Sequence, residues 1–189
     1  MFVRLSIVVL GLFASALAVA ESATYVVDAR HTFPSFEVKH LGFSLQRGRF
    51  NDTSGNIVFD SATKKLSVEI AIDANSIDTG LEAMEKHLRN ADFLDVEKHP
   101  AITFKSTGAR FNGDTLVSVD GNLTLRGQTK PVKLTVNAFR CGQHPMSKRP
   151  TCGADAETTI KRSDFGITYG LPAVADEVRL LINVEASQP

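Results

Sequence analysis

Hydrophobic and polar residues alternate along most of the chain that follows residue 21. In the stretch KKLSVEIAIDA, every second residue from Leu66 to Ile72 is hydrophobic, and most residues between them are polar. The same alternation recurs over 117–125, 132–136 and 178–184, and shorter runs lie at 25–28, 36–40, 57–60 and 102–105. A period of two is typical of half-buried strands, so the sequence predicts roughly eight to ten strands.

Short polar links separate these strands. The links at 51–52, 60–64, 112–114 and 126–128 are rich in residues that favour turns. Consecutive strands joined in this way predict an antiparallel sheet, closed as a barrel or folded as a sandwich. Several strands extend over about nine to eleven residues, a span of roughly 30 Å, and eight such strands leave room for one small ligand along a barrel axis. An interior filled by side chains is equally consistent with the periodicity.

One segment departs from the alternation. In SIDTGLEAMEKHLRNADF, Leu81, Met84 and Leu88 recur at helical spacing, and Thr79 followed three residues later by Glu82 predicts a capping box. We therefore expect a short amphipathic helix over 81–90 that crosses one end of the sheet. Whether this helix moves as a lid is left open by the sequence.

The segment HLRNADFLDVEKHP, residues 87–100, concentrates histidine and acidic side chains. A metal site would hold its ligands at a defined spacing such as i,i+4, and His87 and His99 are too far apart in sequence for that argument. The residue before Pro100 is restricted to extended backbone, as at the start of a strand. We interpret the segment as a corner between helix and strand, with a metal or catalytic role as the alternative.

The first twenty residues have a composition of their own. Arg4 is followed by the apolar run LSIVVLGLFASAL and then by Ala18-Val19-Ala20, a small-x-small site that a signal peptidase can cut. The run is short for a bilayer span. We therefore interpret residues 1–20 as a cleaved signal peptide and residues 21–189 as one domain, with an uncleaved membrane anchor as the alternative.

The charge of the mature chain argues against a polyanionic partner. The full chain has 21 basic and 21 acidic residues, so removal of Arg4 with the signal peptide leaves a formal charge of −1. Basic residues alternate with acidic ones, and the sequence contains no lysine or arginine block. Nucleic acid is therefore excluded as an expected partner.

The chain contains two cysteines, Cys141 and Cys152. In an exported protein a disulfide is the natural pairing, and the spacing fits neither a CxxC redox motif nor a four-ligand zinc site. Closing so short a loop removes about 3 kcal/mol of unfolded-state entropy. The sequence thus predicts a stapled loop, with a reactive cysteine pair as the alternative.

A series of short motifs covers nearly the whole mature chain. In order they are YVVD at 25–28 with His31, FEVKHLG at 36–42, GRF at 48–50, GNIVFD at 55–60, SIDT at 76–79, HLR at 87–89 before DF at 92–93, PAITF at 100–104, GNLTLRG at 121–127 before KPV at 130–132, and RSDFGI at 162–167. In this order the motifs resemble the YceI-like family of secreted lipid-binding proteins. The cysteine loop is an addition to the simplest family pattern.

The resemblance implies an all-β fold, namely an extended lipocalin-like antiparallel β-barrel of about eight strands with a short α-helix crossing one end. Residues 21–189 would form this single domain in the periplasm. The resemblance also implies a carrier or binding protein for a polyisoprenoid or a similar long-chain amphiphile, such as a quinone, a prenyl phosphate or a fatty acid derivative. No catalytic residue, metal or cofactor is expected, and no stable membrane insertion follows signal cleavage.

A tail of this kind gains roughly 0.8 kcal/mol for each buried methylene, so a carrier needs a lined tunnel with polar groups only at its mouth. The candidate tunnel residues are hydrophobic residues of the predicted strands: Phe36, Val38, Phe50, Ile57, Phe59, Ile70, Ile102, Phe104, Leu123 and Leu134. Four polar residues of an early hairpin are candidates for a rim that contacts the head group: His31, His40, Arg47 and Arg49.

Two other classes of function remain open. A periplasmic enzyme acting on a lipid-like substrate would need polar groups with perturbed pKa values inside the tunnel, centred on His31, His40 or His99. A stress-related interaction module would have a filled barrel with an exposed apolar patch or sheet edge. The chain is also compatible with a homodimer.

Overall fold

The computed structural model describes residues 22–189, so the predicted signal peptide at 1–20 lies outside the described residues. Its strands are β1 (Ala23–Val27), β2 (Ser35–His40), β3 (Ser44–Phe50), β4 (Thr53–Asp60), β5 (Lys65–Asp73), β6 (Ile77–Asp78), β7 (Ala101–Asn112), β8 (Thr115–Leu125), β9 (Gln128–Gln143), β10 (Pro150–Lys161) and β11 (Val174–Ser187). Short 3-10 turns lie at η1 (Ala74–Ser76) and η2 (Arg162–Phe165). Within 22–189, no helix combines the length and the hydrophobicity that a membrane crossing needs.

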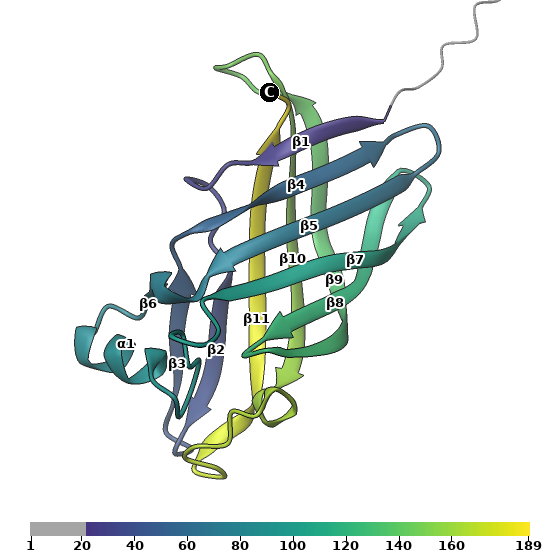
Figure 1. The fold of residues 1–189 in the computed structure, drawn as a ribbon. Helices are drawn as coiled ribbons and strands as arrows, with labels where there is room; N and C mark the ends of the chain where they lie inside the picture. Colours follow the sequence, from purple (N-terminus) through teal and green to yellow (C-terminus); the bar gives the residue numbers. More distant parts are fainter. Residues whose placement is uncertain (1–21) are drawn as a thin grey trace, which may run out of the picture.

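The strands form one antiparallel sheet that closes into a barrel (Figure 1). β1 and β2 follow each other along the same edge of β11, and β4 and β3 pair with them on the other side. The order around the barrel is β1/β2, β3/β4, β5, β7, β8, β9, β10 and β11, and the pairing of β1 with β11 completes the ring. The predicted eight-stranded antiparallel barrel is confirmed, and the sandwich is not formed.

The barrel is elongated because several of its strands are long. These strands are longer than the sequence pattern indicated. β9 has 16 residues and β11 has 14. β10 and β11 pair without interruption from Thr151↔Ser187 to Lys161↔Glu177. At the usual rise per residue, β11 spans roughly 45 Å, which gives the barrel two well-separated ends (Figure 1).

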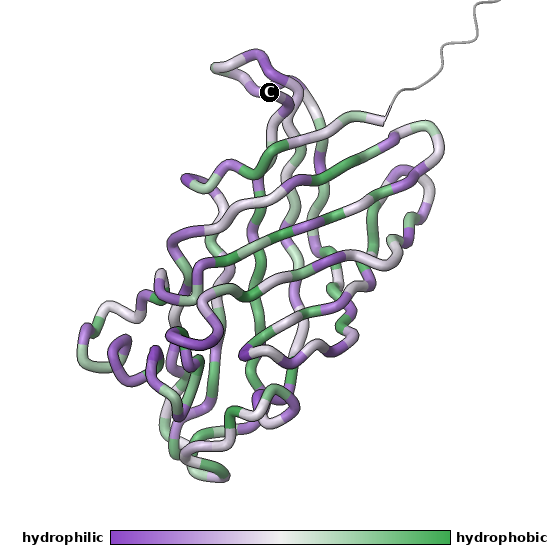
Figure 2. The backbone as a smooth tube through the Cα atoms, in the orientation of Figure 1, coloured by the Kyte–Doolittle hydropathy of each residue, from purple (hydrophilic) through white to green (hydrophobic). Residues whose placement is uncertain are grey.

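Alternation along each strand sorts side chains between the inside and the outside of the barrel. On β5, Val68 and Ile70 face the interior. Glu69 lies between them on the outer face, where its Oε1 is 2.7 Å from the Nζ of Lys105 on β7. Figure 2 shows this alternation of hydrophobic and hydrophilic residues along the strands. The period of two in the sequence is therefore the division between cavity and solvent.

The predicted helix forms as α1 (Glu82–Arg89). The predicted capping box is wrong, because Leu81 is the N-cap residue and no side chain caps the helix there. The backbone N–H of Thr79 instead donates to Oε1 of Glu85, at 2.9 Å, one turn further than the expected Glu82. This bond still fastens the first turn of the helix to the segment that leads into it.

Segment 87–100 forms the predicted corner between α1 and β7. Arg89 donates hydrogen bonds of 2.9 Å to the carbonyl oxygens of Asn75 and Ile77, which fastens α1 beside β6. The N–H of His99 donates to the carbonyl of Asp95 at 2.9 Å and sets the entry into β7. Among residues 22–189, no group of three or more His, Cys, Asp or Glu side chains is placed to hold a metal ion.

Candidate functional site

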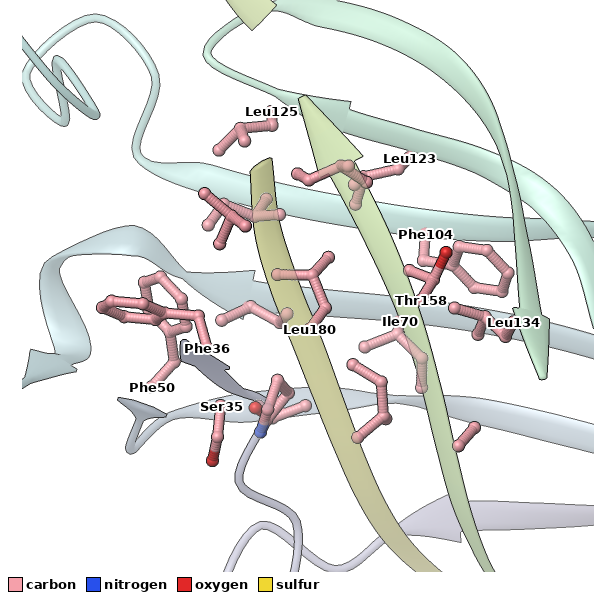
Figure 3. A pocket seen from close by; sticks show the side chains of 18 of the residues that line it. Ser35, Phe36, Phe50, Ile70, Phe104, Leu123, Leu125, Leu134, Thr158 and Leu180 are labelled. Carbon is pink, nitrogen blue, oxygen red and sulfur yellow. The ribbon is translucent and has the colours of Figure 1, made fainter. Parts of the chain in front are cut away.

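The barrel encloses a cavity of about 470 Å³, which is within the range of small-molecule sites. Figure 3 shows hydrophobic side chains of several strands converging on it, with Phe36 and Phe50 side by side. All ten predicted tunnel residues lie on its wall: Phe36, Val38, Phe50, Ile57, Phe59, Ile70, Ile102, Phe104, Leu123 and Leu134. The barrel interior is therefore not filled by side chains. That these residues hold a ligand stays a prediction.

Strand register explains why these residues share one cavity. Ile70 of β5 is opposite Phe104 of β7, which is in turn opposite Leu123 of β8. Directly opposed residues project from the same face of a sheet, so one inward residue sets the inward face of its neighbours. Gly48 is opposite Phe36, and a Cβ at Gly48 would lie 2.5 Å from the Phe36 ring. Because glycine has no side chain, the Phe36 ring can pack directly against the backbone of β3 at Gly48.

Aromatic side chains close the end of the cavity near β1 and the β9–β10 connection. The ring centroid of Phe59 lies 5.9 Å from that of Phe111 and 5.6 Å from that of Phe139. Cys152 packs in the same buried cluster and is joined by a disulfide to Cys141, its opposite residue in β9. Because these groups are hydrophobic and packed together, the wall of the cavity is hydrophobic at this end.

Besides Arg47, four ionisable residues of the cavity wall gather at the opposite end. His40 belongs to β2, His87 to α1, Arg162 to η2 and Tyr169 to the loop before β11. Tyr169 is 52% exposed while it also lines the cavity, so the cavity meets solvent here. The ring centroids of His87 and Tyr169 are 5.3 Å apart, which brings α1 against the loop across this mouth.

Arg162 organises the mouth from beneath the surface. It is 5% exposed. Its guanidinium donates to four backbone carbonyls at 2.8 to 3.2 Å, those of Ile167, Tyr169, Val174 and Ala175. Burial lowers the pKa of Arg162, against an opposing effect of Asp176, yet an arginine remains charged in proteins. A positive charge therefore lies at the mouth of an otherwise hydrophobic cavity.

Two of the predicted rim residues lie near this mouth but point in different directions. His40 is in phase with Phe36 along β2 and lines the cavity. Arg47 borders the cavity through its strand, but it is opposite Glu37, one position out of phase, and its Nε donates to Glu37 Oε1 at 2.7 Å on the outer face. This hydrogen bond, the largest cause, lowers the pKa of Glu37. Arg47 thus borders the cavity while its guanidinium is paired on the outer face, and its contact with a head group stays a prediction.

The other two predicted rim residues do not line the cavity. His31 belongs to the loop between β1 and β2, where its Nδ1 lies 2.9 Å from Asp28 Oδ2. Arg49 is turned outward to Asp78, with 3.7 Å between Nε and Oδ2. Its guanidinium also lies 4.8 Å from the centroid of the Phe33 ring. Both placements correct the prediction, because each side chain has a partner outside the barrel.

A family model described as the YceI-like domain matches residues 25–186, nearly the whole of the described barrel. The chain belongs to the YceI-like family. A relative in Pseudomonas aeruginosa, a UPF0312 protein, is 41% identical over 169 residues, which cover 88% of this chain and 87% of the relative. The family assignment by motif order is confirmed.

Two solved structures share the YceI-like barrel. BcnA of Burkholderia cenocepacia superposes with a TM-score of 0.73 at 27% identity, covering 85% of this chain and 99% of BcnA. A domain from Saccharophagus degradans, described as a polyisoprenoid binding domain, superposes with a TM-score of 0.66 at 19% identity, covering 89% and 100% of the two chains. The second likeness shows the fold alone.

Three mouth residues of this YceI-like barrel were missed by the sequence pattern. Arg162 follows Ile160, a buried residue of β10, by two positions, so the inward phase of the strand was a signal for it. His87 lies within the helix predicted over 81–90, but the sequence does not indicate its distance from the mouth. Tyr169 lies in a loop without periodicity, and no sequence pattern indicated it.

Proposed function

We propose that this protein is an exported binding protein that holds a polyisoprenoid or a similar long-chain amphiphile inside the barrel. The observation that carries the proposal is the asymmetry of the cavity. One end is closed by Phe59 and its aromatic neighbours, and the other meets solvent beside Arg162 and His40. An amphiphile has the same asymmetry, with a long hydrophobic tail and one polar end.

The energetics favour a tail inside the barrel. Each methylene-sized group taken out of water contributes roughly 0.8 kcal/mol, and a wall of aliphatic and aromatic residues gives that gain without specific polar contacts. Such a wall selects for hydrophobicity and width more than for one chemical structure. The proposal therefore includes quinones, prenyl phosphates and fatty acid derivatives as ligands with the same kind of tail.

The head group would lie at the mouth. A guanidinium has five N–H donors, and the four carbonyl contacts of Arg162 leave one donor unassigned. His40 adds a ring that can donate or accept a hydrogen bond. Either side chain suits the carbonyl of a quinone or the oxygens of a phosphate or carboxylate. The tail would then point towards the Phe59 end.

Export is part of the same proposal. The signal-like segment at 1–20 would direct the chain out of the cytoplasm, and the disulfide between Cys141 and Cys152 would be stable in an oxidising compartment. In the periplasm, a long-chain lipid that leaves a membrane needs shielding from water. The Saccharophagus domain is described as binding a polyisoprenoid, and this chain has the same fold.

The test is to purify the mature protein from its own cells without detergent, record a native mass spectrum, and identify what organic solvent releases. We expect a bound long-chain amphiphile in near-stoichiometric amount. An Ile70→Trp variant places a large ring in the cavity and should carry less ligand. Glu69→Trp places the same ring on the outer face of the same strand and serves as the control.

Two results would contradict the proposal. A clean apo mass that persists after incubation with quinones and prenyl phosphates would remove the binding function and direct effort to partner capture. Release of a chemically altered lipid after incubation with a defined one would favour an enzyme. Of the three histidines considered for catalysis, only His40 lines the cavity, so a His40→Gln variant that still holds the lipid but no longer alters it would favour the enzyme.

A further inference from the structure

Four exposed hydrophobic side chains lie at the mouth end of the barrel. Phe43 is 91% exposed at the tip of the β2–β3 hairpin, with Leu41 and Leu45 at 50% and 43% beside it. Tyr169, in the neighbouring loop, both borders the cavity and faces solvent. Single exposed hydrophobic residues are ordinary, but a group of them marks a site of interaction. We call Leu41, Phe43, Leu45 and Tyr169 the mouth tip.

The exposure is built into the hairpin. Leu41 has a positive φ of 52°, and the N–H of Phe43 donates to the carbonyl of His40 at 3.0 Å, so a tight turn projects the Phe43 ring outward. The N–H of Leu41 donates to the carbonyl of Ala173 at 2.9 Å, which ties the hairpin to the loop that carries Tyr169. Figure 1 shows both segments at the same end of the barrel, and Figure 2 shows hydrophobic residues in both.

The charge of these two segments suits a lipid surface. Between Val38 and Asn51 the chain carries Lys39, Arg47 and Arg49 and no acidic residue. Arg47 and Arg49 are paired with Glu37 and Asp78, so Lys39, beside the tip of the hairpin, is the basic residue available to a lipid head group. From residue 165 to residue 175 it carries no charged residue at all. Anionic lipid head groups attract basic residues near the surface, and uncharged side chains enter the interface without the cost of desolvating a charge.

We propose that the mouth tip docks reversibly on a lipid bilayer and places the cavity mouth against it. The inference rests on the proposed function, because the ligand would then pass between membrane and barrel without crossing water. A few inserted side chains give weak attachment, comparable to that of a single acyl chain. Reversible attachment suits a binding protein that leaves the membrane with its ligand.

The experiment separates docking from ligand binding. Wild type, Phe43→Ser and Met146→Ser are mixed with vesicles of phosphatidylethanolamine and phosphatidylglycerol (about 3:1) containing a fluorescent long-chain prenol, and flotation and prenol extraction are measured. Met146 is a matched control, being 83% exposed in the β9–β10 connection at the other end of the barrel. Binding of the same prenol is also measured after its dilution from ethanol, without vesicles.

We expect Phe43→Ser to lower both flotation and extraction from vesicles about tenfold, since a Phe side chain loses its burial in the interface. Prenol binding without vesicles should match wild type, and Met146→Ser should behave as wild type throughout. Wild type that does not float with vesicles, or Phe43→Ser that floats equally well, would overturn the docking proposal.

A second copy of the chain is the other occupant that the test can detect. If sedimentation shows a wild-type dimer that Phe43→Ser converts to monomer, the mouth tip is a protein interface and the membrane proposal is wrong. If wild type floats but neither wild type nor the variants bind prenol in either assay, the proposed function fails while docking stands. The two proposals therefore fail by different results.

Discussion

Nη1 of Arg162 lies 2.8 Å from the carbonyl oxygen of Tyr169. This hydrogen bond links the end of β10 to the loop that borders the mouth of the cavity. The same guanidinium reaches the first residues of β11 through Val174 and Ala175. One buried side chain therefore joins three segments at the mouth of the cavity, and the shape of the mouth depends on it.

We predict that Arg162→Met destabilises the protein by about 3 kcal/mol or more, because it leaves one buried and three partly buried carbonyls without this donor. Arg162→Lys should lose less, since an ammonium keeps the charge but cannot reach all four carbonyls. Urea unfolding measures both changes. Arg47→Met is the control on the outer face and should have a much smaller effect. A Met variant within about 1 kcal/mol of wild type would contradict the structural role of Arg162.

We predict that Gly48→Ala narrows the cavity. Its Cβ would lie 2.5 Å from Cζ of Phe36, so the ring must move off the wall towards the interior. We expect a stability loss of about 1 to 3 kcal/mol and an affinity for a long-chain prenol lowered about tenfold, or ~1.4 kcal/mol. Fluorescence titration measures the affinity. Gly142→Ala, whose Cβ meets nothing within 4 Å, is the control, and equal affinities in the two variants would refute the prediction.

The sequence predicted the wall of the cavity better than its mouth, for a physical reason. The wall is built from strands, and a period of two assigns every residue to one of two faces once one residue is placed. Ile70, Phe104 and Leu123 could thus be chosen as wall residues from the sequence. Which hydrophobic face of each strand lies inside the barrel became certain only from the structure, since outer hydrophobic residues alternate in the same way.

The mouth depends on loops and on strand phase. Arg47 and His40 are both polar residues of the β2–β3 hairpin, and the sequence does not distinguish them. They are one residue out of phase across the hairpin, so the Arg47 guanidinium points outward while His40 lines the cavity. Tyr169 reaches the mouth in a loop that Arg162 holds by a hydrogen bond and that packs against His87. Contacts of this kind join residues that no local pattern connects.

We predict that the disulfide stabilises the closed end of the barrel. Removing it in a Cys141→Ala/Cys152→Ala double variant should lower the free energy of unfolding by about 2 to 4 kcal/mol, the usual effect of a short closed loop. Urea unfolding of the oxidised and the reduced wild type should differ by a similar amount. A midpoint that reductant leaves unchanged would show that the cysteines are unpaired in solution or that the loop is not under constraint.

We predict that Asp28 titrates far below its ordinary range. The hydrogen bond with His31, the largest cause, together with those from Arg30 lowers the pKa of Asp28 to about 2. A carboxylate whose folded-state pKa is lowered contributes its stability above the unfolded value of about 4, and that contribution is lost as the pH falls towards 2. Carboxyl NMR titration should give the low midpoint, and His31→Gln should raise it.

The same pair makes a prediction for stability. Asp28→Asn should cost less than about 1 kcal/mol at pH 6, because the pair lies near the surface. The difference between wild type and variant should shrink between pH 4 and pH 2, as the wild-type carboxylate takes up its proton. Urea unfolding across this range measures the difference. Two results would show that His31 does not hold Asp28 in solution. One is a stability difference between wild type and variant that does not vary with pH, and the other is an Asp28 titration midpoint near 4 in the wild type.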